Sequence, residues 1–214
     1  VMKQLGADPK EVQEIANKVA EGDFSMNINL KQGDTNSLLA SMNKMVQTIK
    51  DMVQDVQKLG NSATEGKLDV RADATKFHGE YKQLVQGLNS TLDAIIGPLN
   101  VAAEYIDCIS KGDVPPKIID EYKGDFNEIK NNINQCIDAI NLLIKDTYDL
   151  AEHATNGRLN ERAKAERHQG DFRRLVQGIN STLDRLVGLI DNMPIPVRIV
   201  DKNNNVLYEN QNKL

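Results

Sequence analysis

Few side chains in this sequence have the types and spacing that enzymatic or metal chemistry requires. The two cysteines, Cys108 and Cys136, lack metal-site spacing, and no histidine pairs with either. His78, His153 and His168 fall in or near segments without helical periodicity, where we expect solvated or capping side chains. No Gly-rich loop follows a predicted strand, so no phosphate-binding loop is indicated. We therefore expect no catalytic residue, no cofactor and no bound metal.

Four small polar side chains stand at positions that a packed helix would bury. Cys136 falls on an apolar stripe, where we interpret it as a small core residue, and Cys108 lies beside the stripe as a partly buried filler. Thr91, Thr147 and Thr182 fall on stripes too. Either their hydroxyls bond back to the helix, or they weaken the packing so that two bundle states lie close in energy.

These stripes belong to a unit that recurs four times. Each copy has a glycine that ends a helical pattern (Gly22, Gly66, Gly112 and Gly157), then a connector, then a long apolar stripe. The gap from glycine to stripe is 16, 18, 17 and 18 residues, whereas each complete stripe spans 25 residues to its last apolar position. Since removing one residue turns a helix by about 100° and loops tolerate length changes, the fixed part is predicted to be helix and the variable part connector.

The stripe positions follow alternating steps of four and three residues, a 3.5-residue repeat typical of left-handed coiled coils. Such a stripe needs a partner helix. We expect that partner in a second chain, although an antiparallel bundle within one chain would give similar stripes. Together with a shorter stripe before the first glycine, the positions expected to form the bundle core and relay the signal are Val12, Ile15, Val19, Leu38, Met42, Met45, Ile49, Val56, Leu59, Leu84, Leu88, Thr91, Ile95, Ile109, Ile129, Ile133, Cys136, Ile140, Leu150, Leu175, Ile179, Thr182 and Leu186.

The helices are predicted to run continuously from one unit into the next. Asp8-Pro9 suits a helix start, with Asp as cap and Pro in the first turn. Apolar connector residues are expected to hold the connectors against the bundle: Met26, Ile28, Leu30, Leu68 and Val70. Pro98 on a stripe predicts either a kink or a junction between the second and third units. The expected fold class is all-α: serial helix–connector–helix units that form parallel four-helix coiled-coil bundles as a homodimer, plus a short C-terminal β-hairpin.

The four copies also resemble one another in sequence. Residues 84–93 recur as residues 175–184 with one conservative change, and residues 79–81 match 124–126 and 170–172. The first unit carries Asp8-Pro9, then Ala20-Glu21-Gly22-Asp23-Phe24, then Ser37-Leu38-Leu39-Ala40-Ser41-Met42. With these motifs it resembles the HAMP unit that follows the last membrane span of many bacterial chemoreceptors. The other copies have an acidic residue at the start of the second helix, whereas the first has Asp34 a few residues earlier.

The resemblance implies an array of HAMP units, which dimerise as parallel four-helix bundles. The expected boundaries are residues 5–58, 53–99, 98–144 and 141–190, with residues 191–214 as the truncated start of a PAS domain. Pro194 and Pro196 end the helical pattern, and 197–201 and 206–209 read as strands around an Asn-rich turn, similar to the opening hairpin of a PAS domain. A stray terminal hairpin is the alternative.

Composition narrows the function classes. Aromatics are 4% with no Trp, which is low for a globular enzyme, and a net charge of −5 without a basic run gives no nucleic-acid signal. No stretch approaches 18 apolar residues. The resemblance implies a fragment of a receptor on the cytoplasmic side of the bacterial inner membrane, with a membrane span upstream, a PAS and output module downstream and no small-molecule ligand in this part.

The predicted function is a non-catalytic signalling relay in a chemoreceptor-like protein. Two alternatives stay open: the HAMP/PAS linker of a sensor histidine kinase or cyclase, and a passive coiled-coil spacer.

Overall fold

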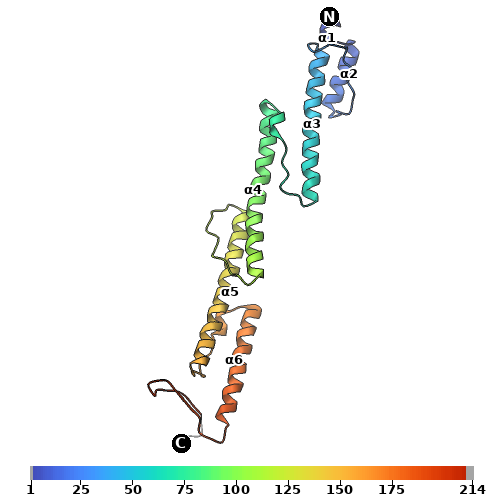
Figure 1. The fold of residues 1–214 in the computed structure, drawn as a ribbon. Helices are drawn as coiled ribbons and strands as arrows, with labels where there is room; N and C mark the ends of the chain where they lie inside the picture. The colour runs from blue at the N-terminus through green and yellow to red at the C-terminus, as the bar shows by residue number, and fades with distance from the viewer. Residues whose placement is uncertain (1, 211–214) are drawn as a thin grey trace. The chain divides into compact units, whose positions relative to one another are not determined.

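The structure, a computed structural model, describes residues 2–210, and helices dominate it (Figure 1). The chain divides into two compact units, residues 1–99 and 100–214, and the division falls inside one helix. The elements in chain order are α1 (Met2–Leu5), α2 (Pro9–Ala20), α3 (Leu38–Thr64), the 3₁₀ turn η1 (Ala74–Lys76), α4 (Gly79–Ser110), α5 (Asp125–Thr155), the 3₁₀ turn η2 (Ala165–Arg167), α6 (Gly170–Asp191), β1 (Arg198–Val200) and β2 (Val206–Glu209).

The predicted continuity of the helices is confirmed. Each of α3, α4 and α5 runs without a break from an apolar stripe to the next glycine stop, and α4 continues through Pro98. Within each compact unit, the connector returns along its helix pair, so that the two helices run in the same direction (Figure 1). No helix among residues 2–210 is long and apolar enough to cross a membrane.

The helix ends follow local hydrogen-bond chemistry. Gly22, Gly66, Gly112 and Gly157 all have φ between 76° and 85°, a left-handed conformation that glycine adopts without steric cost. In each case the residue after the glycine donates its N–H to a carbonyl five residues earlier, as Lys67 does to Ser62 at 2.8 Å. These bonds satisfy carbonyls that the helix leaves unpaired. At the other end, Asp8 accepts a hydrogen bond from the Lys10 N–H at 2.9 Å, as its position before Pro9 predicts.

In the first compact unit, two small cores hold the helices to their connectors. The first joins α2 and α3 through Val12, Ile15 and Leu39, with Ile28 from the connector packed between them. The second joins α3 and α4 through Leu59 and Val85, with the connector residues Ala72 and Phe77. Ile28, Met26, Leu30 and Val70 pack as the sequence predicts. Leu68 does not: it is exposed, because the chain has just left the helix end there and the connector has not yet turned onto α4.

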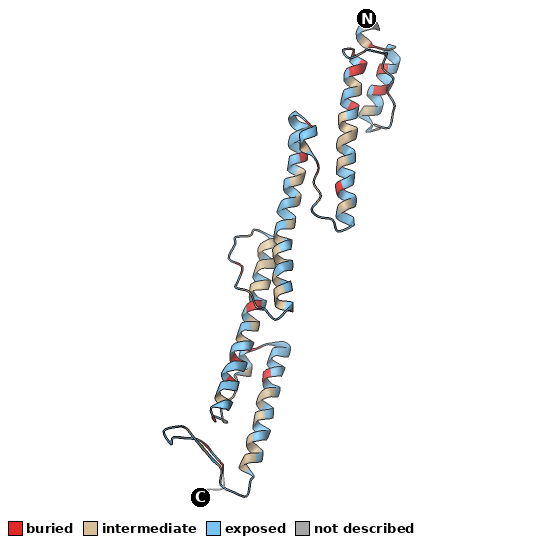
Figure 2. Ribbon diagram, viewed as in Figure 1, coloured by how far each residue is buried: buried red, intermediate tan, exposed pale blue. Residues whose placement is uncertain are grey.

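In the second compact unit, Ile118, Ile137, Leu150 and Val176 are the deeply buried apolar residues of the helical part. The strands β1 and β2 form an antiparallel hairpin in which Ile199 pairs with Tyr208, at the strand positions that the sequence predicts. Most helical residues are intermediate or exposed, and the buried ones are few (Figure 2). A single chain therefore leaves much of its apolar surface uncovered.

Candidate signalling interface

The second helix of each unit has three distinct faces. One face packs against the neighbouring helix of the same chain. Its deepest positions are Leu39, Val85 and Val176, each about 1% exposed and each one residue past the start of a stripe. Eight residues past the stripe start, Val46 and Ile137 are buried on the same face. The sequence alone did not predict that these positions are buried. The signal that could have revealed them is that apolar residues recur beside the stripe.

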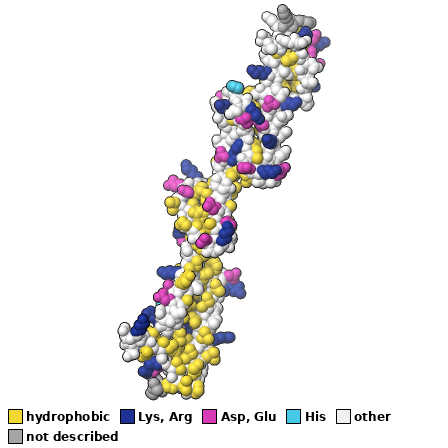
Figure 3. Space-filling view, viewed as in Figure 1, with side chains coloured by type: hydrophobic (Ala, Val, Ile, Leu, Met, Phe, Trp, Pro, Cys, Tyr) yellow, Lys and Arg dark blue, Asp and Glu magenta, His cyan; other side chains and the backbone are white. Residues whose placement is uncertain are grey.

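The predicted stripe itself forms the second face, and most of it is exposed or only partly buried. Leu84 is 54% exposed, Leu175 51% and Leu186 51%. Figure 3 shows hydrophobic side chains gathered on the visible face over α5 and α6. Of the expected relay positions, four are buried (Val12, Ile15, Leu59, Leu150), nine are intermediate (Val19, Met42, Ile49, Leu88, Ile109, Ile129, Ile133, Ile140, Ile179) and ten are exposed (Leu38, Met45, Val56, Leu84, Thr91, Ile95, Cys136, Leu175, Thr182, Leu186).

The threonines on the stripe bond back to their own helices, as one of the two interpretations predicts. The hydroxyl of Thr91 donates to the carbonyl of Gly87 at 2.9 Å, that of Thr147 to Leu143 at 2.7 Å, and that of Thr182 to Gly178 at 3.0 Å. Since the hydroxyls are satisfied within the helix, these residues can face an apolar partner without an unpaired donor.

The third face holds the connector through an asparagine that forms two hydrogen bonds to one connector residue. Asn89 accepts from the Ala72 N–H at 3.0 Å and donates to the Ala72 carbonyl at 2.8 Å. Asn134 does the same with Ile118, and Asn180 with Ala163. Each pair satisfies both backbone groups of a residue that belongs to neither a helix nor a strand. We call these three pairs the asparagine clamps.

Next to each clamp, a cation of the connector pairs with an aspartate of the helix. Arg71 contacts Asp93 at 2.6 Å, Arg162 contacts Asp184 at 2.7 Å and Lys117 contacts Asp138 at 2.6 Å. The arginines also donate to connector carbonyls, including those of Leu68 and Leu159. Because the aspartates are largely exposed, each ion pair contributes little by itself, and the arginines' main effect is to fix the connector backbone.

The first unit lacks both the asparagine clamp and the ion pair beside it. The residues at the corresponding positions are Ile28 and Asn43 for the clamp, and Asn27 and Gln47 for the ion pair. Among the hydrogen bonds of residues 2–210 there is none between Ile28 and Asn43. Instead, Asp34 accepts hydrogen bonds from the Ser37 hydroxyl at 2.7 Å and backbone N–H at 3.1 Å, and this bonding lowers the pKa of the Asp34 carboxyl. Asp34, the acidic residue that precedes this helix, therefore holds Ser37, the N-cap residue of α3, in place.

The prediction that all three histidines are solvated or cap a helix is wrong for His168, which is buried. It is 3% exposed, and its Nε2 lies 3.0 Å from a carboxylate oxygen of Asp146 on α5. The other oxygen of Asp146 accepts from Arg167 at 2.8 Å. At the corresponding position in the second unit stands the equally buried Phe77. The sequence held a signal for this site, because the aromatic residues Phe77 and Tyr122 precede the second and third stripes by the same seven residues.

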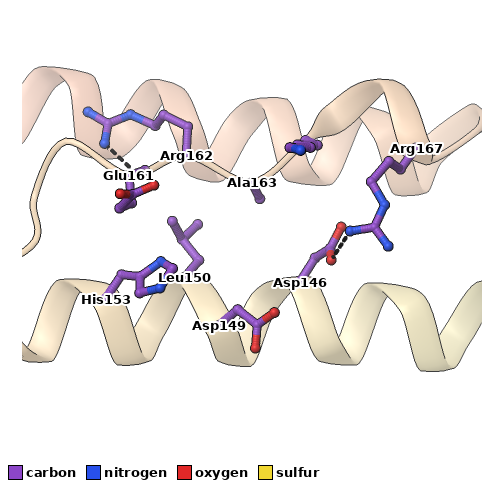
Figure 4. Close-up of a pocket in the computed structure, with 9 residues that line it drawn as sticks. Asp146, Asp149, Leu150, His153, Glu161, Arg162, Ala163 and Arg167 are labelled. Atoms are coloured by element: carbon purple, nitrogen blue, oxygen red, sulfur yellow. Dashed lines mark hydrogen bonds and ion pairs between the residues drawn. The ribbon is translucent and has the colours of Figure 1, made fainter.

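Beside this pair lies a pocket of about 190 Å³ with mixed charges. Figure 4 shows Asp146 on α5 joined to Arg167 of the connector, with Asp149 and His153 beside it on the same helix. Within residues 2–210 there is no group of three His, Cys, Asp or Glu side chains placed to hold a metal ion. The bonds of Arg167 and His168 to Asp146 tie α5 to the connector, which the clamp at Asn180 ties to α6.

A family model described as HAMP domain matches the chain in two segments, residues 76–142 and 167–193. The first segment runs from η1 through α4 and its connector into α5, and the second covers α6. These two segments are therefore similar to HAMP domain sequence, and the match supports a HAMP-containing signalling protein. HAMP domains are signalling linkers of receptors rather than catalytic domains.

Proposed function

We propose that this chain is a tandem relay of four HAMP units that works as a parallel homodimer. The observation that carries this proposal is the exposed stripe, which keeps a coiled-coil repeat over several heptads while a separate face already satisfies the packing within the chain. A second copy of the same chain supplies a matching stripe for each helix. The two chains then complete a four-helix bundle in each unit.

Each bundle relays by choosing between two packing arrangements. Because α3, α4 and α5 each belong to two successive units, a rotation in one bundle turns the helix that feeds the next. A relay of this kind needs two states within a few kcal/mol of each other. Stripe residues such as Thr91, Cys136 and Thr182 pack less tightly than leucine would and keep that difference small.

The biological setting in this proposal is the cytoplasmic side of a bacterial inner membrane, in a chemoreceptor-like protein. A sensor with a membrane span lies upstream, and the hairpin of β1 and β2 opens a PAS domain that leads to the output module. Motifs of the first unit, notably Asp8-Pro9 and residues 20–24, support the chemoreceptor setting. A histidine kinase or cyclase is the alternative, and a phospho-acceptor helix with an ATP-binding domain in the full-length sequence would decide for the kinase.

Disulfide cross-linking tests the parallel dimer. In a chain with Cys108 and Cys136 replaced by serine, Met45→Cys or Ile49→Cys is expected to cross-link to its own copy under mild oxidation, because equivalent stripe residues meet at the dimer axis. Lys44→Cys, an exposed position beside the stripe, is the control and should stay largely uncross-linked. A folded chain that is monomeric by light scattering and shows no difference between these positions would disprove the parallel dimer.

Substitution of the stripe threonines tests switching against the passive spacer. Thr91→Ile with Thr182→Ile is expected to raise the melting temperature and to bias the output of the full-length protein toward one state. Each added apolar side chain contributes about 1–2 kcal/mol per subunit if it fits without strain. Thr64→Ile, off the stripe at the end of α3, is the control. If the threonine variants are more stable but the full-length protein still responds normally to its stimulus, the result would favour the passive coiled-coil spacer.

A further inference from the structure

One of the four glycine stops has a neighbour that the others lack. A Cβ atom built on Gly22, Gly66 or Gly112 would meet nothing within 4 Å. At Gly157 it would lie 2.6 Å from Cγ2 of Ile199 and 3.4 Å from Cδ1 of Leu207, both in the β-hairpin. The hairpin therefore sits directly on the terminal turn of α5. Residues 154–158 and residues 199–202 line the groove where the two segments meet.

The same hairpin is also fixed to the last turn of α6, through Tyr208, which pairs with Ile199 across the strands, and through Asn210. The phenol of Tyr208, 3% exposed, donates to the Asp191 carboxylate at 2.6 Å, and burial and this bond raise the pKa of Tyr208 to about 12. Asn210, 2% exposed, donates to the carbonyls of Ile190 and Ile195 and accepts from the Val197 N–H at 3.0 Å. Both side chains are buried with their polar atoms satisfied, as an ordered joint requires.

We propose that the hairpin is a bracket across the ends of α5 and α6, seated on Gly157 through Ile199 and locked to α6 by Tyr208 and Asn210. Residue 157 is then a docking site as well as a helix stop. If α5 moves relative to α6, it moves the hairpin directly through the contact at Gly157. Movement of α6 is transmitted separately, through Tyr208 and Asn210. This signalling consequence rests on the proposed relay function, whereas the docking itself does not.

Nuclear magnetic resonance of the 214-residue chain with labelled isoleucine and leucine methyl groups tests the docking. A nuclear Overhauser effect is expected between the Ile199 methyl and the Gly157 α-protons. Gly157→Asn should keep the backbone conformation, because asparagine tolerates a left-handed φ. It should remove the contact between residue 157 and Ile199, because the asparagine side chain fills the space that Ile199 occupies. The Ile199 and Leu207 methyl resonances should shift, and amide exchange in β1 should rise at least about tenfold.

Gly66→Asn is the matched control, since Gly66 has a φ of 76° against 78° for Gly157 but no neighbour. It should leave the hairpin resonances in place. Ile199→Ala combined with Gly157→Asn should restore slow exchange in β1, because the smaller side chain makes room. If the Overhauser effect is missing in the unmodified chain, or if both asparagine variants disturb the hairpin equally, the bracket is wrong.

A second variant tests whether the bracket senses α5. Asp146→Asn loosens α5 from the connector at a site eleven residues before Gly157, with no contact to the hairpin. The Leu207 methyl resonance should shift in the unmodified background and shift far less in the Gly157→Asn background. Equal shifts in both backgrounds would mean that α6 alone moves the hairpin. Since this readout needs no downstream output, it separates failure of the bracket from failure of the relay.

Discussion

Deletion of Gln54 from the middle of α3 is expected to abolish or lock the output of the full-length protein. The deletion turns everything downstream by about 100° and shortens the helix by about 1.5 Å. Leu59, which is 7% exposed and packs with Phe77 and Val85, would leave its core, and the stripe of the second unit would fall out of phase with that of the first. Losing a buried leucine contact costs about 2–5 kcal/mol.

Deletion of Thr75 is the control. Thr75 lies in η1, and the corresponding part of the third unit is one residue shorter and has no 3₁₀ turn. The deletion removes two short hydrogen bonds to Asp73 but leaves both helices in phase. Output and the cross-linking pattern of α4 stripe positions should be largely kept. Equal loss of output from both deletions would show that helical phase is not what the array transmits.

Replacement of a clamp asparagine is expected to have the largest effect of any single polar substitution. Asn180→Ala leaves both partly buried backbone groups of Ala163 without their partner, and each hydrogen bond of this kind contributes about 0.5–1.5 kcal/mol. The connector between α5 and α6 should loosen. Hydrogen exchange of residues 158–164 should accelerate by a factor of about 30 for a loss of 2 kcal/mol, and the melting temperature should fall by several degrees.

Asn43→Ala supplies the comparison, because Asn43 occupies the same position in the first unit without the two bonds to Ile28. Its exchange pattern and melting temperature should change little. Similar losses in both variants would mean that the asparagine matters for the helix itself, and that the bonds to the connector are incidental.

The sequence determined the helices, because their signals are local and repeated. A left-handed glycine stop, an aspartate cap and a 3.5-residue stripe each depend on a few neighbouring residues, so Gly66, Asp8 and the stripe starting at Leu84 could be read without knowing the fold. The hairpin positions followed in the same way from alternating apolar residues around an Asn-rich turn. The constant length of each stripe also revealed which segments are rigid.

Only the tertiary structure decided which face of a helix meets which partner. The clamp between Asn180 and Ala163 and the seat of Ile199 on Gly157 join residues 17 and 42 positions apart, across connectors whose path no local pattern specifies. The burial of His168 was misread for the same reason: its partner Asp146 lies 22 residues earlier, on another helix. Such contacts depend on how the connector returns along the helix pair, and that path is set by packing between distant segments rather than by the propensity of any one of them.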